Sequence, residues 1–370
     1  MIFLKRRALM TRANFNYKTV SGIGSIVLEN CVETRFKRLV LSGNSKQGEN
    51  PSIESPKEIK NSGKYDEVSG KYAIDVSVTG KNLFDISKYN QYDDTWTNTT
   101  YTTKILKLKP NTTYTMSCKR LVDKPKQYVI FNIVRGIKTG KGIIVQINPS
   151  LQLNHFTGKG TFTTDETGEI VLNYYVDCPK EKYWFTEVIG DIQIELGSTQ
   201  TAYDAYKEPQ TTQIALDEPL RGIGEYKDVI TKDGIVRNIL QVRIADYLQK
   251  DIYGKPGGRY IFSAVPNCYI NYDRKRCMSN VGFTTNQENI AYMLVPYLDN
   301  FKLVVSDDDT VETIREKVKD VVVAYTVKEP ILEPLENSLE SLHTNDGTTI
   351  ITVDSGEVET GIEVEYAVKS

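Results

Sequence analysis

Short strand-like runs, separated by turn signals at regular spacing, fill the middle of this 370-residue chain. Between residues 82 and 206, runs of alternating or β-branched residues are followed by turn segments such as Pro110-Asn111. In the last run Ile192, Ile194 and Leu196 alternate with polar residues, so one face of that strand is expected to be buried. The pattern predicts an antiparallel β-sandwich, of the jelly-roll kind, over this segment.

The chain length and the residue pattern outside this segment predict further domains. At about 150 residues per domain, 370 residues indicate two or three domains. We predict an N-terminal arm and attachment segment over residues 1–81, with a linker or surface arm near 49–64. A connector with a hairpin follows the sandwich at 207–240. A smaller β-rich C-terminal domain with one helix covers 241–370, so the predicted fold class is mainly β.

Two local signals in the C-terminal half predict specific elements. The turn at Lys232-Asp233-Gly234 lies between two apolar runs and predicts a hairpin, because Asp and Gly tolerate positive φ. A helix is expected near residues 310–320, with Asp309 as N-cap and Glu312 completing a capping box. The last two strand-like runs, 348–353 and 361–368, are predicted to form a terminal hairpin.

Composition argues against several classes of function. Lys and Arg total 46 against 48 Asp and Glu, so the chain has no basic excess for nucleic acid. No stretch reaches the roughly 18 apolar residues of a membrane helix, and no signal-peptide core is visible. The five Cys lie far apart without a Cys-x-x-Cys pair, which argues against a metal site. We expect synthesis in the bacterial cytoplasm, with Cys268 and Cys277 as free thiols.

Motifs for catalysis are also sparse. The chain has two His, and it lacks both a Gly-x-Ser-x-Gly elbow and a His-Glu-x-x-His sequence. We therefore expect a protein that is not an enzyme, with no catalytic residue, metal or cofactor. A glycan hydrolase needs only two placed carboxylates, so that alternative stays open.

Several sequence segments, taken in their order along the chain, resemble those of a known protein family. They are Asn82-Leu83-Phe84-Asp85, Lys109-Pro110-Asn111-Thr112-Thr113-Tyr114, Asp191-Ile192-Gln193-Ile194-Glu195-Leu196-Gly197, Pro219-Leu220-Arg221-Gly222-Ile223-Gly224 and Pro330-Ile331-Leu332-Glu333-Pro334-Leu335. Over roughly residues 65–370 the chain resembles tail fibre and baseplate proteins of phages and prophages of low-GC Gram-positive bacteria. The resemblance implies a carbohydrate-binding-module-like jelly roll at 82–206. It also implies a structural protein of the virion, at the tail tip, that contributes to receptor binding.

The resemblance also sets expectations for partners. These are other tail or baseplate proteins and a host cell-surface polysaccharide or surface protein. We expect a homo-oligomer, with a trimer as the favoured form, because fibres grow along a symmetry axis. A stand-alone carbohydrate-binding module of a secreted protein is the other reading, and the missing signal peptide argues against it.

One aromatic-rich segment, residues 89–101, is the candidate sugar site. Sugar rings stack on exposed aromatic rings, and their hydroxyl groups need polar partners nearby. Trp96 is the expected anchor, flanked by the rings of Tyr92 and Tyr101. The expected hydroxyl partners are Asp93, Asp94 and Asn98. The alternative is that Trp96 belongs to the core, since Trp is highly buried on average.

Overall fold

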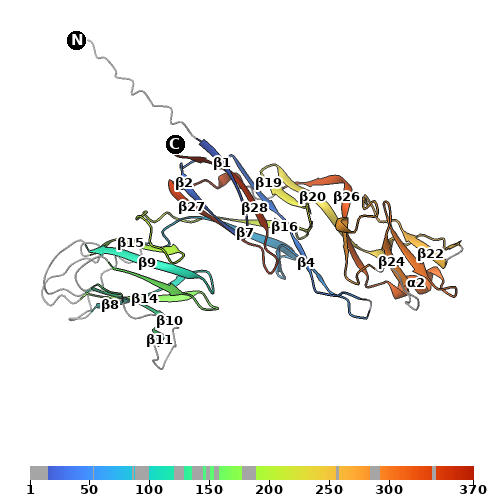
Figure 1. The fold of residues 1–370 in the computed structure, drawn as a ribbon, viewed down its shortest axis with the longest axis horizontal. Coiled ribbons are helices and arrows are strands. Elements are labelled where there is room, and N and C mark those ends of the chain that lie inside the picture. The colour runs from blue at the N-terminus through green and yellow to red at the C-terminus, as the bar shows by residue number, and fades with distance from the viewer. Residues whose placement is uncertain are drawn as a thin grey trace, which may run out of the picture.

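The computed structural model describes residues 16–52, 54–85, 87, 100–120, 129–135, 145–146, 151–153, 158–176, 189–255, 258–283, 292–335 and 339–370. Within these residues the chain consists of antiparallel strands, three short 3-10 turns and a single α-helix (Figure 1). The mainly β fold class is therefore confirmed. A jelly-roll strand order in the central domain stays a prediction.

A twelve-stranded sheet forms the scaffold of the molecule. Its strands are β1 (Asn16–Ile23), β2 (Ser25–Cys31), β3 (Arg38–Ser42), β6 (Lys64–Asp66), β7 (Lys71–Gly80), β16 (Gln210–Leu216), β19 (Val229–Thr231), β20 (Gly234–Arg243), β23 (Cys277–Ser279), β26 (Val322–Glu333), β27 (Gly347–Asp354) and β28 (Gly361–Val368). One arm runs β16-β7-β27-β2, and the other starts at β28 and continues β3-β19-β20-β26-β23. β2 and β28 are joined by a single residue pair, Cys31 with Val368.

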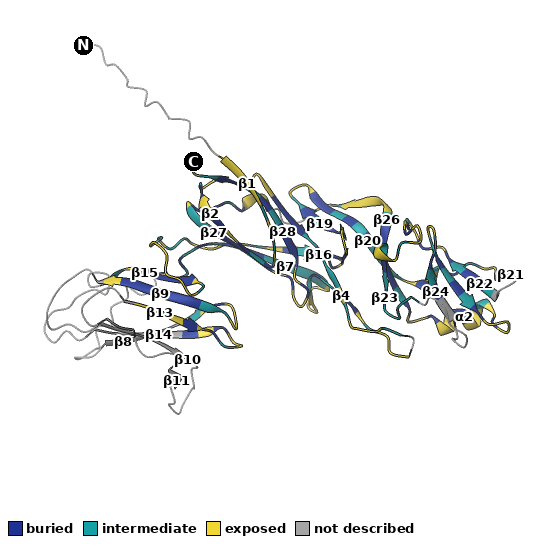
Figure 2. Cartoon of the chain, in the orientation of Figure 1, coloured by how far each residue is buried: buried dark blue, intermediate teal, exposed yellow. Residues whose placement is uncertain are grey.

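The two arms share one hydrophobic core. Alternate residues of β7, such as Val76 and Val78, are buried together with Val364 and Tyr366 of β28. Strands with one buried and one wetter face can form such a core only by packing face to face. The scaffold is therefore a β-sandwich, and Figure 2 shows the buried residues along its strands.

Pairing between the two ends of the chain builds this scaffold. Asn16 pairs with Val368, and Gly80 pairs with Thr349. The strands of residues 16–80 thus lie in one sandwich with the last two strands, a grouping that differs from a separate N-terminal arm. The predicted terminal hairpin is wrong, because β27 pairs with β2 and β7 whereas β28 pairs with β1 and β3. The expected linker at 49–64 contains β5 (Ile59–Asn61), which pairs with β4 (Ser45–Gln47) just before the linker.

The first lobe, residues 82–206, is inserted between β7 and β16. It has two sheets, β11-β10-β14-β8 with β12 alongside, and β13-β9-β15. The strands are β8 (Thr100–Lys107), β9 (Thr113–Arg120), β10 (Val129–Arg135), β11 (Val145–Gln146), β12 (Leu151–Leu153), β13 (Gly158–Thr163), β14 (Glu169–Val176) and β15 (Ile189–Leu196). Met116 and Ile194 of the three-stranded sheet are fully buried, as is Ile170 of the other sheet.

The second lobe, residues 244–321, is inserted between β20 and β26. Its sheet has the order β21 (Tyr253–Lys255), β22 (Gly258–Ser263), β25 (Phe301–Val305) and β24 (Tyr292–Pro296). The 3-10 turns η2 (Ile244–Tyr247) and η3 (Arg274–Arg276) and the helix α2 (Val311–Lys317) complete the lobe. Figure 1 shows the two lobes at opposite ends of the scaffold.

Two local predictions about the C-terminal half have opposite outcomes. The Asp-Gly hairpin is confirmed, because β19 and β20 pair around this turn. The assignment of Asp309 as N-cap is wrong: Thr310 is the cap, and its partner in the capping box is Thr313. The carboxylate of Asp309 instead accepts hydrogen bonds from Ser306 and Lys317.

Candidate binding site

The predicted sugar-binding loop lies almost entirely outside the described residues. This applies to Trp96, Tyr92, Asp93, Asp94 and Asn98. Tyr101 is the exception: it lies in β8, where its backbone pairs with Tyr175 of β14. A recognition role for the loop therefore stays a prediction.

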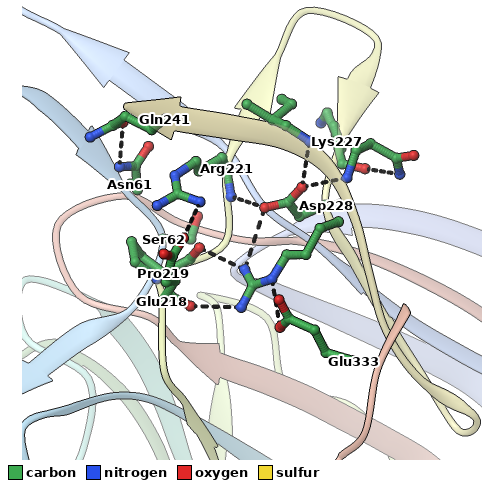
Figure 3. Close-up of polar contacts among 12 residues, drawn as sticks. Asn61, Ser62, Glu218, Pro219, Arg221, Lys227, Asp228, Gln241 and Glu333 are labelled. Atoms are coloured by element: carbon green, nitrogen blue, oxygen red, sulfur yellow. Dashed lines mark hydrogen bonds and ion pairs between the residues drawn. The ribbon is translucent and has the colours of Figure 1, made fainter. Parts of the chain in front are cut away.

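The described residues contain a different cluster of polar side chains, which joins the connector to the scaffold strands β20 and β26 (Figure 3). Its centre is Asp228, which is completely buried. One carboxylate oxygen of Asp228 accepts the backbone N–H groups of Asn238 and Ile239, at 2.8 and 3.0 Å. The other accepts the N–H of Arg221 at 3.0 Å and the Nη1 of Arg237 at 3.4 Å. Burial raises the pKa of Asp228, while the N–H donors and the Arg237 charge act in the opposite direction.

Arg237 in β20 has acceptors for each of its guanidinium nitrogens. Nη1 donates to the carbonyl of Pro219 at 2.8 Å, and Nη2 donates to the carbonyl of Glu218 at 2.9 Å. Nε donates to the carboxylate of Glu333 in β26 at 2.9 Å. Because Arg237 is only 2% exposed and fully satisfied, it ties the connector to two scaffold strands and has no capacity left for a ligand.

Arg221 lies in the same cluster but has a different environment. Its residue exposure is 5%, yet Nε and Nη1 make no hydrogen bond. Nη1 lies 2.7 Å from the carboxylate of Glu218, an ion-pair distance, but without hydrogen-bond geometry. The Glu218 side chain is 58% exposed, so this contact is at the surface of the cluster.

Gly222 allows the backbone beside Arg221 to pack closely against the backbone at Gly43. A Cβ added at Gly222 would meet the carbonyl oxygen of Gly43 at 2.2 Å, closer than any real side chain comes. The backbone next to Arg221 can therefore pack against Gly43 only because residue 222 has no side chain. The strands β17 (Gly222–Ile223) and β18 (Tyr226–Lys227) then return the chain to Asp228.

A cavity of about 840 Å³ adjoins Arg221 and is lined by residues from the segments 58–72, 219–241 and 356–357, together with Asn280 and Val322. The side chains around it include two cations, two carboxylates, three amides and two tyrosines, namely Lys60, Lys64, Glu58, Glu357, Asn61, Gln241, Asn280, Tyr65 and Tyr72. The Tyr65 and Tyr72 rings lie 5.1 Å apart between centroids and are tilted by 58°. The cavity thus combines aromatic rings, hydrogen-bonding amides and charge, which is the usual make-up of a ligand site.

A second cavity, of about 640 Å³, lies between the scaffold and the first lobe. Lys109 and Leu196 line it from the lobe, and Asp354 and Glu359 line it from the scaffold. Burial lowers the pKa of Lys109, and the charges of Glu359 and Asp354 oppose that shift. The cavity at this junction therefore has charged groups from both sides next to apolar residues such as Leu196.

Sequence reasoning missed Arg221 as a site residue, although the phrase that contains it was part of the family resemblance. Nothing local marks Arg221 as buried, because the segments packed beside it, at Gly43 and Ser62, are distant in the sequence. Its neighbour Gly222 is the available signal, since a glycine beside a charged residue can mark a close backbone approach.

Neither a metal site nor a membrane-spanning helix is found among the described residues. Within the described ranges, no group of three or more His, Cys, Asp or Glu could hold a metal ion. The helix found in that part of the chain is not long and apolar enough to cross a membrane. Comparison with protein families, with curated proteins and with solved structures finds no match to this chain.

Proposed function

We propose that this chain is a non-enzymatic structural and binding protein of a phage-like tail tip, as a fibre or baseplate component. The observation that carries the proposal is the double insertion, in which one β-sandwich scaffold presents two lobes. The family resemblance of the sequence supplies the kind of particle. The protein would be made in the bacterial cytoplasm and incorporated into the tail.

Both lobes are inserted where two scaffold strands lie side by side. Val78 pairs with Gln210 at the base of the first lobe, and Arg243 pairs with Val322 at the base of the second. Insertion at such a point leaves the scaffold pairing intact, because the lobe needs only two neighbouring attachment points. A scaffold of this kind suits a protein that presents binding surfaces.

An edge strand of the scaffold supports self-assembly. Among the described strands β1 pairs only with β28, and its residues Tyr17 and Ile23 are 55% and 61% exposed. A free strand edge with apolar side chains can pair with another chain. We propose that this edge takes part in a homo-oligomer, with a trimer as the expected form, or contacts another tail protein. Light scattering of the purified chain measures this, and a monomer at high concentration, alone and with tail partners, would argue against it.

The first lobe is the proposed recognition module, with a host surface polysaccharide as ligand and residues 89–101 as the contact. The test compares the full chain with a variant in which a short Gly-Ser linker joins Gly80 to Gln210. Because Val78 pairs with Gln210, a few linker residues can close the gap. We expect the variant to fold and assemble but to lose binding to Gram-positive host cells. Equal cell binding by both proteins would place recognition elsewhere.

A further inference from the structure

We propose that the cavity beside Arg221 binds an anionic saccharide, meaning a sugar ring that carries a carboxylate or a phosphate. Almost all residues that line the cavity come from the scaffold and the connector, and none of them comes from the first lobe. The proposal therefore stands independently of the recognition role assigned above to the first lobe.

The two arginines of the polar cluster provide the central argument. Arg237 and Arg221 are equally inaccessible, at 2% and 5% exposure, yet Arg237 finds an acceptor for every nitrogen. Arg221 has two buried nitrogens without a hydrogen bond. Nη1 has an ion-pair contact with Glu218, whereas Nε has no acceptor to replace the water removed from it, and a buried donor in that state is costly. A ligand that supplies acceptors would remove this cost.

The shape of the guanidinium group specifies the ligand chemistry. Its N–H groups form a planar fork that matches a carboxylate or a phosphate, and such pairs are among the strongest hydrogen bonds in proteins. Glu218 already brings a carboxylate to 2.7 Å from Nη1. Because Glu218 is mostly exposed and makes no hydrogen bond there, a ligand oxyanion can displace it at low cost.

The cations around the cavity are paired with carboxylates. Lys60 forms an ion pair with Glu357, and Lys64 pairs with Asp75 and Asp354. Arg221 contacts Glu218. The preference for an anion therefore comes from the Arg221 nitrogens that make no hydrogen bond, and not from an excess of positive charge.

The remaining groups favour a sugar ring over a bare ion. Tyr65 is 58% exposed and lies against Tyr72, so an aromatic surface faces the cavity. Sugar rings carry apolar faces that pack on such surfaces, and their hydroxyl groups bind amides such as Gln241. A volume of about 840 Å³ falls within the usual range for small-molecule sites.

The test is calorimetric titration of the full chain with four probes. These are a glucuronic acid disaccharide, glucose 6-phosphate, the neutral disaccharide that matches the first, and inorganic phosphate. We expect at least one charged sugar to bind at least tenfold more tightly than the neutral sugar and than inorganic phosphate. Whichever charged sugar binds identifies the anionic group.

Three substitutions make the assignment specific. Arg221→Met should weaken binding of the charged sugar at least tenfold. Arg38→Met is the matched control, because Arg38 is an exposed, paired arginine on β3, and it should leave binding unchanged. Glu218→Gln should tighten binding several-fold, because it removes the competing carboxylate. That variant changes an exposed side chain, so it tests the proposal even if Arg221→Met fails to fold.

Three results would overturn the proposal. The first is no binding of either charged sugar by the folded chain. The second is unchanged affinity in both Arg221→Met and Glu218→Gln. The third is inorganic phosphate that binds as tightly as the charged sugars, which would contradict the assignment of a sugar ring.

Discussion

The two inserted lobes are joined to the same scaffold in different ways. In the second lobe the scaffold strands themselves enter the lobe, so Val323 and Tyr325 of β26 belong to the same core as Ile314 of α2. β4 and the loop that follows it add hydrogen bonds, from Gln47 to Ser279 at 2.6 Å and from Lys57 to Asn280 at 2.7 Å. Between the first lobe and the scaffold lies instead a cavity of about 640 Å³, and none of the described residues of the first lobe belongs to the scaffold core.

This difference has a physical consequence. A shared hydrophobic core makes two units unfold together, whereas units with separate cores can unfold independently. We therefore expect the scaffold and second lobe to behave as one cooperative unit and the first lobe to behave as another. In the proposed tail protein, this division would let the first lobe reorient on a host surface while the scaffold and second lobe stay fixed in the particle.

The largest expected effect comes from paired core truncations. Phe301→Ala removes a fully buried ring from the second lobe and should cost about 3–5 kcal/mol, a loss that also lowers the stability of the scaffold. Met116→Ala in the first lobe should cost about 2–5 kcal/mol and leave the scaffold transition in place. Urea unfolding, followed by hydrogen exchange of each segment, measures both. Equal loss of protection in all three parts after Met116→Ala contradicts the independence of the first lobe.

A slightly smaller loss is expected at the polar cluster. Asp228→Asn removes one of the two carboxylates that face Arg237 and places an NH2 group opposite backbone N–H donors, and it should cost about 3 kcal/mol. Arg221→Met should change stability by less than about 1 kcal/mol in either direction, because it removes a guanidinium group that has unsatisfied nitrogens. Chemical denaturation of both variants checks this contrast. A larger loss for Arg221→Met than for Asp228→Asn would mean that the two arginines have been assigned the wrong roles.

The order in which the cysteine thiols react should show which lobe opens first, and the experiment needs no substitution in the chain. Cys268 and Cys277 are free and buried in the core of the second lobe, and burial raises the pKa of each thiol to about 12. Cys118 is buried in the first lobe. If the first lobe opens separately, Cys118 reacts before Cys268 and Cys277 in mild urea. Mass spectrometry of the labelled chain gives the order, and the reverse order would count against the comparison.

The smallest effect is a pH dependence in the second lobe. The Asp309 carboxylate is desolvated, but its bonds from Lys317 and Ser306 outweigh this and lower its pKa below the ordinary value of 3.8. A lowered folded pKa gives stability that is present above the unfolded value and lost as pH falls through the folded value. The second lobe should therefore weaken below about pH 4. Asp309→Asn should flatten this acid limb in melting experiments, and an unchanged limb would exclude Asp309 as its cause.

Local features of this fold could be predicted from the sequence, and long-range features could not. The Asp233-Gly234 turn and the helix near Ile314 depend on neighbouring residues, so their signals are complete within a few positions. The pairing of Asn16 with Val368 joins the two ends of the chain and leaves no local trace. A hairpin between the last two strands is the natural local guess, and it fails because strands from the N-terminus pair with both.

The same reasoning applies to the candidate site. Aromatic residues in a polar segment, such as Trp96, can be found by inspection, and their role stays a prediction. The state of Arg221 depends on which acceptors the fold brings near, and only the comparison with Arg237 shows that some are missing. Unsatisfied buried groups are therefore visible in a structure and invisible in a sequence.

The most direct test of the proposed function is an image of the particle. The chain would carry a small C-terminal tag in the bacterium that encodes it, and purified particles would be labelled with an antibody to the tag. The account predicts label at the tip of a phage-like tail, and loss of host adsorption when residues 81–209 are replaced by a linker. Particles that carry no label, from cells that make the tagged chain, would contradict the assignment to a tail.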